Sequence, residues 1–240
     1  MTAAAGARSQ SGGPAAGGRP LLVVPAYFHP ALYPEHWQVL AEQARHLRLV
    51  VLNLASGPGE ALDEAFLPVL ARLRQAGVSV AGYIDTDYGR RPIADVLLDL
   101  TRYRDWYATT GVFFDRAAAA ADYVDHYGAL AQAARQLGAT VVAFNHGVHP
   151  VEAYANHADL LGTFEGPWST YLDLTVPRWV RARPAHQFFH LVYAMPCLRF
   201  GDALDLAWRR NAAGAYVTDH GGDNPWDSLP SVPPPREDHP

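Results

Sequence analysis

Lysine is absent from this chain, and cysteine occurs only once. All 19 basic residues are arginines, so chemistry that needs a lysine amine, such as Schiff-base formation, is excluded. The single cysteine, Cys197, can form neither an intrachain disulfide nor a cysteine-based metal cluster. Because Cys197 stands in the apolar run 194–198 and free cysteines are usually buried, we expect it in the core.

Long apolar runs and an excess of positive charge are missing as well. No run approaches the roughly 18 apolar residues of a membrane helix, and the formal net charge is −5 without a basic patch. These features argue against nucleic-acid and membrane partners. Residues 1–20 are rich in Gly, Ala, Ser and Pro and lack the apolar stretch of a secretory signal, which predicts a disordered tail and a cytoplasmic location. Residues 230–240 are polar and proline-rich, and we expect a second tail there.

Between these tails, eight short apolar runs alternate with helical patterns. The expected strands are 21–27, 49–54, 78–84, 111–114, 140–144, 160–164, 187–193 and 215–218. The expected helices are 35–45, 62–73, 93–103, 123–137, 151–156 and 203–210. Such alternation indicates βαβ units with parallel pairing, and the length suits one barrel. We therefore predict a single (β/α)₈ barrel domain over 21–229. The alternative, an open doubly wound sheet, lacks the glycine fingerprint expected after its first strand.

Polar side chains gather where the expected strands end. They are His29, Asn53, Asp85, Asp87, Asp115, Asn145, His146, Glu165, Tyr193, Asp219 and His220. In a (β/α)₈ barrel, such positions converge on one pocket at the carboxyl ends of the strands. Aromatic residues lie at or near the same ends, and their rings could stack on sugar faces or pack as core and rim residues; these are Tyr27, Tyr83, Tyr88, Trp168, Tyr171 and Tyr193.

Two carboxylates stand out among these groups. Asp115 follows the apolar run 112–114, where a carboxylate is costly unless it faces a polar cavity. Glu165 follows the run 160–164 in the same way. Paired carboxylates across a pocket can cleave a glycosidic bond, one as proton donor and the other as nucleophile or base. The alternatives are that Asp115 caps a helix over 116–121 and that Glu165 forms a salt bridge with Arg116.

Other polar residues at these ends have weaker assignments. Asp85 and Asp87 could bind sugar hydroxyls or form a turn and helix cap. His146 and His149 would be the basis of a metal-dependent hydrolase, but they form a loop pair without a third clustered ligand. The sequence therefore implies no metal and no cofactor.

Seven segments, taken in order along the chain, resemble the spherulin-4 family. They are 53–59, 88–92, 105–107, 111–115, 164–168, 216–219 and 224–230. The resemblance implies a (β/α)₈ barrel and the endo-acting enzymes of glycoside hydrolase family 135, which act on polysaccharide containing N-acetylgalactosamine. The family pattern has an Asp-Glu pair after strand four and a Glu after strand six. Asp115 and Glu165 match the first and third of these, whereas Arg116 stands in place of the second.

The leading hypothesis is therefore a glycosidase-like protein acting on an amino-sugar polymer. Glu165 would be the proton donor and Asp115 the nucleophile or base, because an Arg116 side chain close to Asp115 would lower its pKa. The residues expected to bind the sugar are Asn53, Asp85, Asp87, Asn145, Trp168, Tyr193 and Asp219. The competing hypothesis is a carbohydrate-binding barrel that has lost its acid/base set, as the replacement at Arg116 suggests.

Overall fold

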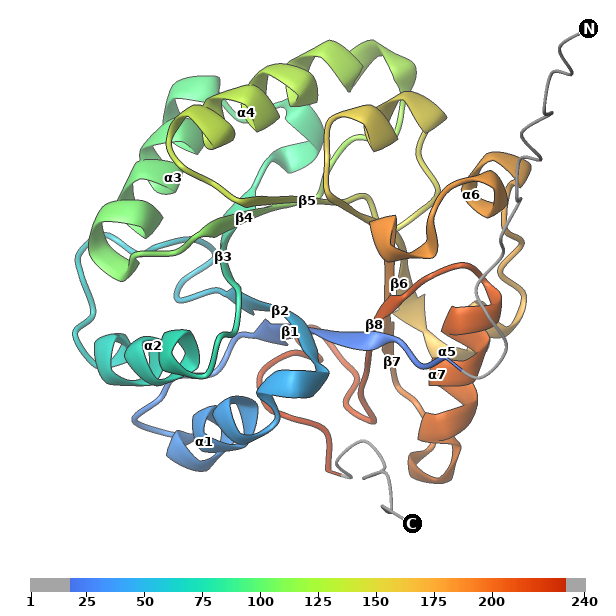
Figure 1. Ribbon diagram of the computed structural model, residues 1–240, viewed down its shortest axis with the longest axis horizontal. Helices are drawn as coiled ribbons and strands as arrows, with labels where there is room; N and C mark the ends of the chain where they lie inside the picture. The colour runs from blue at the N-terminus through green and yellow to red at the C-terminus, as the bar shows by residue number, and fades with distance from the viewer. Residues whose placement is uncertain (1–17, 232–240) are drawn as a thin grey trace, which may run out of the picture.

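The computed structural model describes residues 18–231, and these form a closed barrel of eight parallel strands (Figure 1). The strands are β1 (Leu21–Ala26), β2 (Leu47–Leu52), β3 (Val80–Asp85), β4 (Gly111–Asp115), β5 (Val141–Asn145), β6 (Leu160–Pro167), β7 (Phe188–Tyr193) and β8 (Gly214–Val217). They follow one another around the barrel in sequence order, and β8 pairs with β1. The predicted (β/α)₈ barrel is confirmed, and the open sheet is excluded.

The helices lie around the outside of this barrel (Figure 1). They are α1 (Pro34–Glu42), α2 (Phe66–Gln75), α3 (Ile93–Tyr107), α4 (Val124–Gln136), α5 (Trp168–Leu172), α6 (Arg178–Ala182) and α7 (Phe200–Arg209). Short 3₁₀ turns are η1 (Ala44–His46), η2 (Asp87–Gly89), η3 (Ala121–Tyr123), η4 (Glu152–Asn156), η5 (Ala185–Gln187) and η6 (Cys197–Arg199). The helix expected over 151–156 is the 3₁₀ turn η4, and α5 and α6 were not predicted because each is only five residues long.

The strands are buried on both faces, which explains their nearly continuous apolar runs. In β4, for example, Val112, Phe113 and Phe114 are at most 1% exposed. Phe113 contacts the rings of both Tyr83 and Phe189, so aromatic side chains from β3, β4 and β7 fill part of the core. This stack forms the floor beneath the carboxyl ends of the strands.

A glycine in β6 makes room for a polar side chain just above this floor. A Cβ atom on Gly162 would lie 2.3 Å from Asn145 Oδ1 and 2.6 Å from the Phe189 ring. No side chain fits there without displacing one of them. The absence of a side chain at Gly162 therefore lets Asn145 occupy the space between β5 and β6.

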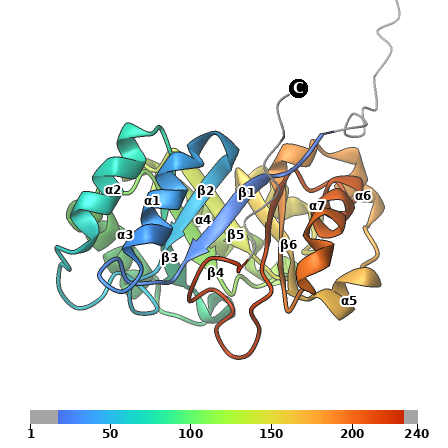
Figure 2. The same cartoon turned by 90° about the horizontal axis from the view of Figure 1, so that it is seen from below.

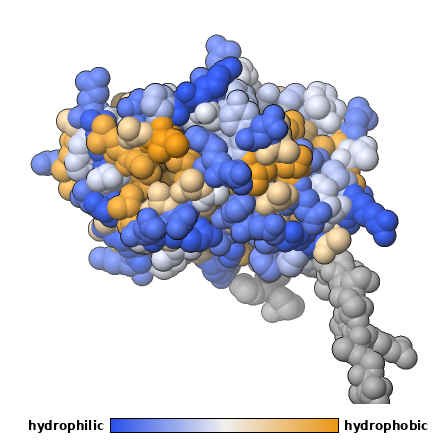
Figure 3. Space-filling model, turned by 90° about the horizontal axis from the view of Figure 1, so that it is seen from above, coloured by the Kyte–Doolittle hydropathy of each residue, from blue (hydrophilic) through white to orange (hydrophobic). Residues whose placement is uncertain are grey.

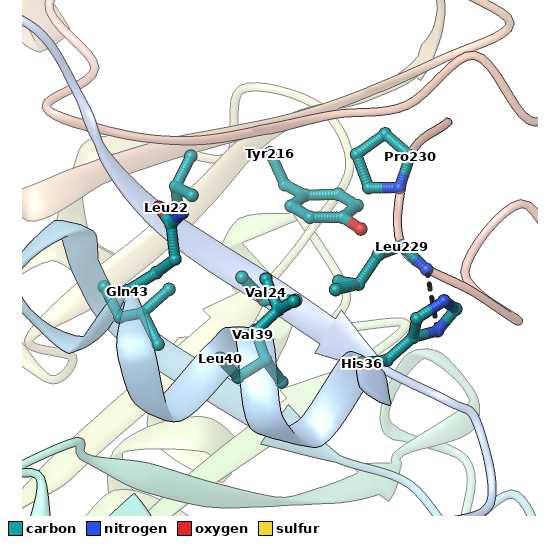
Figure 4. A pocket seen from close by; sticks show the side chains of 10 residues that line it. Leu22, Val24, His36, Val39, Leu40, Gln43, Tyr216, Leu229 and Pro230 are labelled. Atoms are coloured by element: carbon teal, nitrogen blue, oxygen red, sulfur yellow. Dashed lines mark hydrogen bonds between the residues drawn. The ribbon is translucent and has the colours of Figure 1, made fainter. Parts of the chain in front are cut away.

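The chain that follows β8 passes the carboxyl ends of the strands instead of forming a helix within the described residues. In Figure 2 this segment, residues 218–231, protrudes on the side toward which the β1 arrow points. It then packs against α1, where the Leu229 backbone N–H donates to His36 Nδ1 at 3.4 Å (Figure 4). Leu229 and Pro230 help to line a cavity of about 230 Å³ between α1, β1 and β8. The segment carrying Trp226 is thereby fastened to the outside of the barrel.

The expectation that Cys197 lies in the core is wrong, because its side chain is exposed. Strand β7 ends at Tyr193, and Ala194 has a positive φ of 50°, so the apolar run 194–198 leaves the barrel as a loop. The neighbouring Leu198 is 98% exposed. Within this run only Met195 is buried, so apolar residues that follow a strand end do not all belong to the core.

The outer surface mixes apolar and hydrophilic side chains, and on the face shown in Figure 3 the apolar ones gather in separate patches. Within residues 18–231 no helix is both long and apolar enough to cross a membrane. The expected tails, 1–20 and 230–240, lie mostly outside the described residues, so their disorder stays a prediction.

Candidate active site

Two carboxylates and one amide meet at the carboxyl ends of β4, β5 and β6. Asn145 Nδ2 donates to Asp115 Oδ1 at 2.7 Å and to Glu165 Oε2 at 2.5 Å, so these two oxygens lie at most about 5.2 Å apart. One amide nitrogen carries two hydrogens, and each is used by a different carboxylate. The structure thus brings Asp115, Asn145 and Glu165 together at one end of the barrel. The alternative that Asp115 caps a helix does not hold, since residues 116–120 are not helical.

A tyrosine from β3 completes the surroundings of Asp115. The Tyr83 hydroxyl donates to Asp115 Oδ2 at 2.9 Å, so both oxygens of this carboxylate accept a hydrogen bond. The Tyr83 ring is held edge-on by Tyr27, with ring centroids 5.4 Å apart. Sequence reasoning identified both tyrosines only as candidate sugar-stacking or core rings. The hydroxyl of Tyr83 instead fixes the direction of the Asp115 carboxylate.

Burial and mutual repulsion change the acidity of this pair. Burial, followed by the negative charge of Asp115, raises the pKa of Glu165 to about 7, although hydrogen bonds from Asn145 and Trp226 oppose the shift. Burial also raises the pKa of Asp115, and the hydrogen bonds from Asn145 and Tyr83 oppose it. Two carboxylates this close do not both ionise easily, so the pair retains one proton near neutral pH. Of the two residues, Glu165 is the one whose pKa is raised to about 7.

The Arg116 side chain pairs with the aspartates of the β3 loop and not with the carboxylate pair. Its guanidinium donates to Asp85 Oδ2 at 2.8 Å and to Asp87 Oδ1 at 2.5 Å. The expected lowering of the Asp115 pKa by the Arg116 side chain is not found: burial raises this pKa, the side chain pairs with the two aspartates after β3, and Arg116 opposes the rise only through its backbone hydrogen bond. The alternative ion pair between Arg116 and Glu165 is not formed either. Arg116 also has a left-handed backbone, with φ 49°.

The carboxylate pair stands between two lobes of one cleft. The first, which we call the Tyr88 lobe, has a volume of about 350 Å³ and is lined by Tyr88, Asp115, Arg116, Asn145, His146, Gly147, Val148, Glu165 and Tyr193. The second, the Trp226 lobe, has a volume of about 410 Å³ and is lined by Tyr27, Asn53, Leu54, Ser56, Tyr83, Asp115, Glu165, Leu191, Asp223, Asn224 and Trp226. Because Asp115 and Glu165 line both, a ligand that fills the cleft passes directly over them.

The expected sugar-binding residues are divided by this geometry. Asn53, Asn145 and Tyr193 line the cleft. The other four, Asp85, Asp87, Trp168 and Asp219, are not among the residues that line either lobe.

Each of these four has another partner. Asp85 and Asp87 hold Arg116. Trp168 is 8% exposed and packs on Tyr171. Asp219 accepts the backbone N–H of Ser231 at 3.0 Å, at the end of the segment that follows β8. Their role in binding a sugar stays a prediction, and the contacts they make hold loops in place.

Of the two histidines that suggested a metal site, His146 is buried and His149 is partly buried. His146 Nδ1 lies 3.0 Å from the Ala118 carbonyl oxygen, an arrangement that requires a hydrogen on this nitrogen. Burial lowers the pKa of His146 to about 4, so the ring is neutral at physiological pH. Among residues 18–231 no three His, Cys, Asp or Glu side chains are grouped so that they could hold a metal ion.

Sequence reasoning missed Trp226 as a functional residue. It lines the Trp226 lobe, hydrogen-bonds Glu165, and packs edge-on against Tyr193 with centroids 6.0 Å apart. Its segment, 224–230, entered only as part of the family resemblance. The sequence did contain a signal for this role of Trp226. It stands in a proline-containing segment after the last strand, and in a barrel such a segment begins at the carboxyl ends of the strands.

The raised pKa of Glu165 predicts an unusual dependence of stability on pH. Its pKa moves from the ordinary 4.5 to about 7 on folding, so between these values the folded state binds more protons than the unfolded state. The free energy of unfolding should therefore fall as the pH rises through this window, by on the order of 1–3 kcal/mol. Glu165→Gln should lack this decrease. Urea unfolding of both proteins below and above the window measures the effect.

The control for this prediction is Glu152→Gln, the same change at an exposed position on η4. It should follow the wild-type pH profile. An equal pH dependence in wild type and Glu165→Gln would show that Glu165 titrates normally.

The fold and this cleft together define a (β/α)₈-barrel protein with a carboxylate pair at the carboxyl ends of its strands, the face on which barrel enzymes carry their active sites. More particularly, the chain belongs to the family described as spherulation-specific family 4, whose family model matches residues 21–233. The resemblance found in the sequence is thereby confirmed.

Three individual proteins illustrate the relationship. Spherulin-4 of Physarum polycephalum is 28% identical over 169 residues, which cover 68% of this chain and 50% of that protein, so the chain spans about half the length of this curated relative. The crystal structure of Aspergillus clavatus Sph3 in complex with GalNAc has a TM-score of 0.76 and 23% identity, covering 90% of this chain and 94% of that chain. Deoxyribose phosphate aldolase from Aeropyrum pernix has a TM-score of 0.51 and 15% identity, covering 83% and 85%. These structural likenesses show the shared barrel.

Proposed function

We propose that this protein binds an amino-sugar polysaccharide in the cleft and hydrolyses a glycosidic bond above Asp115 and Glu165. The observation that carries this proposal is the carboxylate pair itself, held on one amide nitrogen and surrounded by the two lobes. Glycoside hydrolysis needs two such groups with different protonation states. The GalNAc bound to the structural relative Sph3 supports the choice of N-acetylgalactosamine as the sugar.

The protonation of the pair suggests the role of each residue. Glu165, with its pKa of about 7, holds a proton that it can donate to the leaving oxygen as the bond breaks. Asp115 accepts hydrogen bonds from Tyr83 and Asn145, which stabilise its ionised form as the attacking or orienting group. Asn145 fixes the position of the two carboxylates relative to each other, because its amide group donates a hydrogen bond to each.

The short separation favours one stereochemical outcome. The two oxygens on Asn145 are at most about 5.2 Å apart, which is shorter than the roughly 6.5–9.5 Å between the carboxyl groups of inverting glycosidases and favours the close pair of retaining ones. Asp115 is then the nucleophile, or it orients the acetamido group of the sugar, whose oxygen attacks in a substrate-assisted reaction. Both routes retain the anomeric configuration.

A second candidate function is sugar binding without turnover. The observation favouring it is Arg116, which stands where the family pattern has a Glu. The two candidates differ in what happens to a bound polymer, because only the enzyme produces new chain ends.

The experiment that tests the proposal is incubation of the purified chain with a panel of amino-sugar polymers, followed by measurement of both binding and new reducing ends. We expect new reducing ends from a polymer that contains N-acetylgalactosamine. Binding without new ends would identify a binding protein, and the absence of both would contradict the carbohydrate assignment.

A further inference from the structure

The Tyr88 lobe contains aromatic and apolar side chains beside the carboxylate pair. Tyr88 is 47% exposed and Val148 is 56% exposed, and with Tyr193 they line the same cavity as Asp115 and Glu165. The exposed parts of Tyr88 and Val148 face the cleft beside the polar groups that line the rest of the lobe. A sugar unit lying on this surface would adjoin the unit held over the carboxylates.

Arg116 builds this part of the cleft wall. Its guanidinium carbon lies 5.0 Å from the centroid of the Tyr88 ring, a cation–π distance. The Tyr88 backbone N–H also donates to the Arg116 carbonyl oxygen at 2.7 Å. Since the same guanidinium is tied to Asp85 and Asp87, it joins the loops after β3 and β4 and fixes the place of the ring between them.

The backbone at this point is held in an unfavourable conformation. Asp87, Tyr88 and Arg116 have φ values of 45°, 55° and 49°, in the left-handed region that residues other than glycine seldom adopt. Such conformations persist where surrounding contacts over-determine them, and they cluster at ligand clamps. Here all three occur in the two loops that Arg116 connects.

We propose that Tyr88, Val148 and Tyr193 form a second sugar-binding subsite, and that Arg116 is the positioning residue that holds Tyr88 in it. The subsite takes the apolar face of a neutral N-acetylhexosamine unit, the neighbour of the unit over the carboxylates; this inference rests on the proposed function. Aromatic rings stack on the C–H face of a pyranose. Because Asp85 and Asp87 already neutralise Arg116, the lobe does not call for an acidic sugar.

The test compares the affinity for N-acetylgalactosamine with the affinity for its hexamer, in proteins that also carry Glu165→Gln to prevent turnover. In Tyr88→Ala we expect the hexamer affinity to fall about tenfold, the effect of one lost stacking contact, while the monosaccharide affinity stays unchanged. Tyr88→Phe keeps the ring and should retain the hexamer affinity. Arg116→Gln should lower the ratio of hexamer to monosaccharide affinity, which a general loss of stability would not alter.

One further variant tests the same lobe, and another is a control outside the cleft. Val148→Ser changes the same lobe at an exposed position and should weaken hexamer binding alone, whereas Leu98→Ala, 49% exposed on α3 and outside the cleft, should change nothing. Equal losses for both ligands in Tyr88→Ala would place Tyr88 in the primary site and overturn the second subsite. Unchanged binding in Tyr88→Ala and Val148→Ser would overturn it as well. If the parent protein binds neither ligand, the proposed function itself fails.

Discussion

Replacing Glu165 with glutamine, or Asp115 with asparagine, is expected to lower turnover by about 10²–10⁴-fold each. The amides keep the size and shape of the carboxylates, but the glutamine cannot donate the proton and the asparagine cannot attack or act as a base. Both side chains sit at strand ends above a packed aromatic floor, so the barrel should remain folded. Release of reducing ends from an N-acetylgalactosamine polymer measures turnover, and circular dichroism checks the fold.

The matched controls are Glu152→Gln and Asp105→Asn, which make the same changes on the outer surface. Both should retain wild-type turnover. If either cleft variant cleaves the polymer at the wild-type rate, that carboxylate is not part of the reaction. If none of the proteins, wild type included, cleaves a polymer that all of them bind, the sugar-binding function replaces the enzymatic one.

Restoring the residue of the family pattern, by Arg116→Glu, is expected to reduce both activity and stability. A glutamate there would lose two charge-assisted hydrogen bonds and place a third carboxylate beside Asp85 and Asp87. Thr86 Oγ1 donates to the Asp115 carbonyl oxygen at 2.8 Å, so a loosened β3 loop also disturbs Asp115. We expect turnover to fall at least about tenfold and the free energy of unfolding to decrease, although only modestly, because these ion pairs are exposed to solvent.

Arg135→Glu is the control for charge reversal, because Arg135 pairs with Asp159 at 3.1 Å on the outer surface and is 43% exposed. It should cost some stability and leave turnover unchanged. An increase of activity in Arg116→Glu would mean that the arginine had disabled an older site. In that case the ion pairs by which Arg116 connects the loops after β3 and β4 would not be needed for activity.

The barrel could be predicted because its strands and helices are encoded locally. Each expected strand overlaps the observed one, since a strand buried on both faces needs a continuous apolar run. The unpredicted elements are those without such a pattern. Helices α5 and α6 are too short to show a helical period, and β6 continues past the expected end at 164 to Pro167, through a Glu-Gly pair that has no strand signal.

The meeting of Asp115, Asn145 and Glu165 at one end of the barrel could be predicted from the same pattern of strands. Once the strands are parallel and adjacent in sequence order, residues at their carboxyl ends must meet on one face of the barrel. The sequence could therefore identify a carboxylate cleft and, through the collinear motifs, the family. Strand-end position alone also predicted Asp85 and Asp87 as sugar-binding residues. The structure does not place either of them in the lining of the cleft.

What the sequence by itself determined is thus the alternation of strands and helices, the closed barrel and the end of it that carries the carboxylates. Only the tertiary structure decided which way Arg116 turns, which tyrosine bonds Asp115, and that Trp226 reaches Glu165 from beyond the last strand. The physical reason is the separation of the partners along the chain. A strand pattern depends on residues that are close in the sequence. In contrast, Arg116 and Asp85 are 31 residues apart, and Tyr83 and Asp115 are 32 residues apart. Their contacts, and the acidity that follows from them, exist only after the barrel has closed.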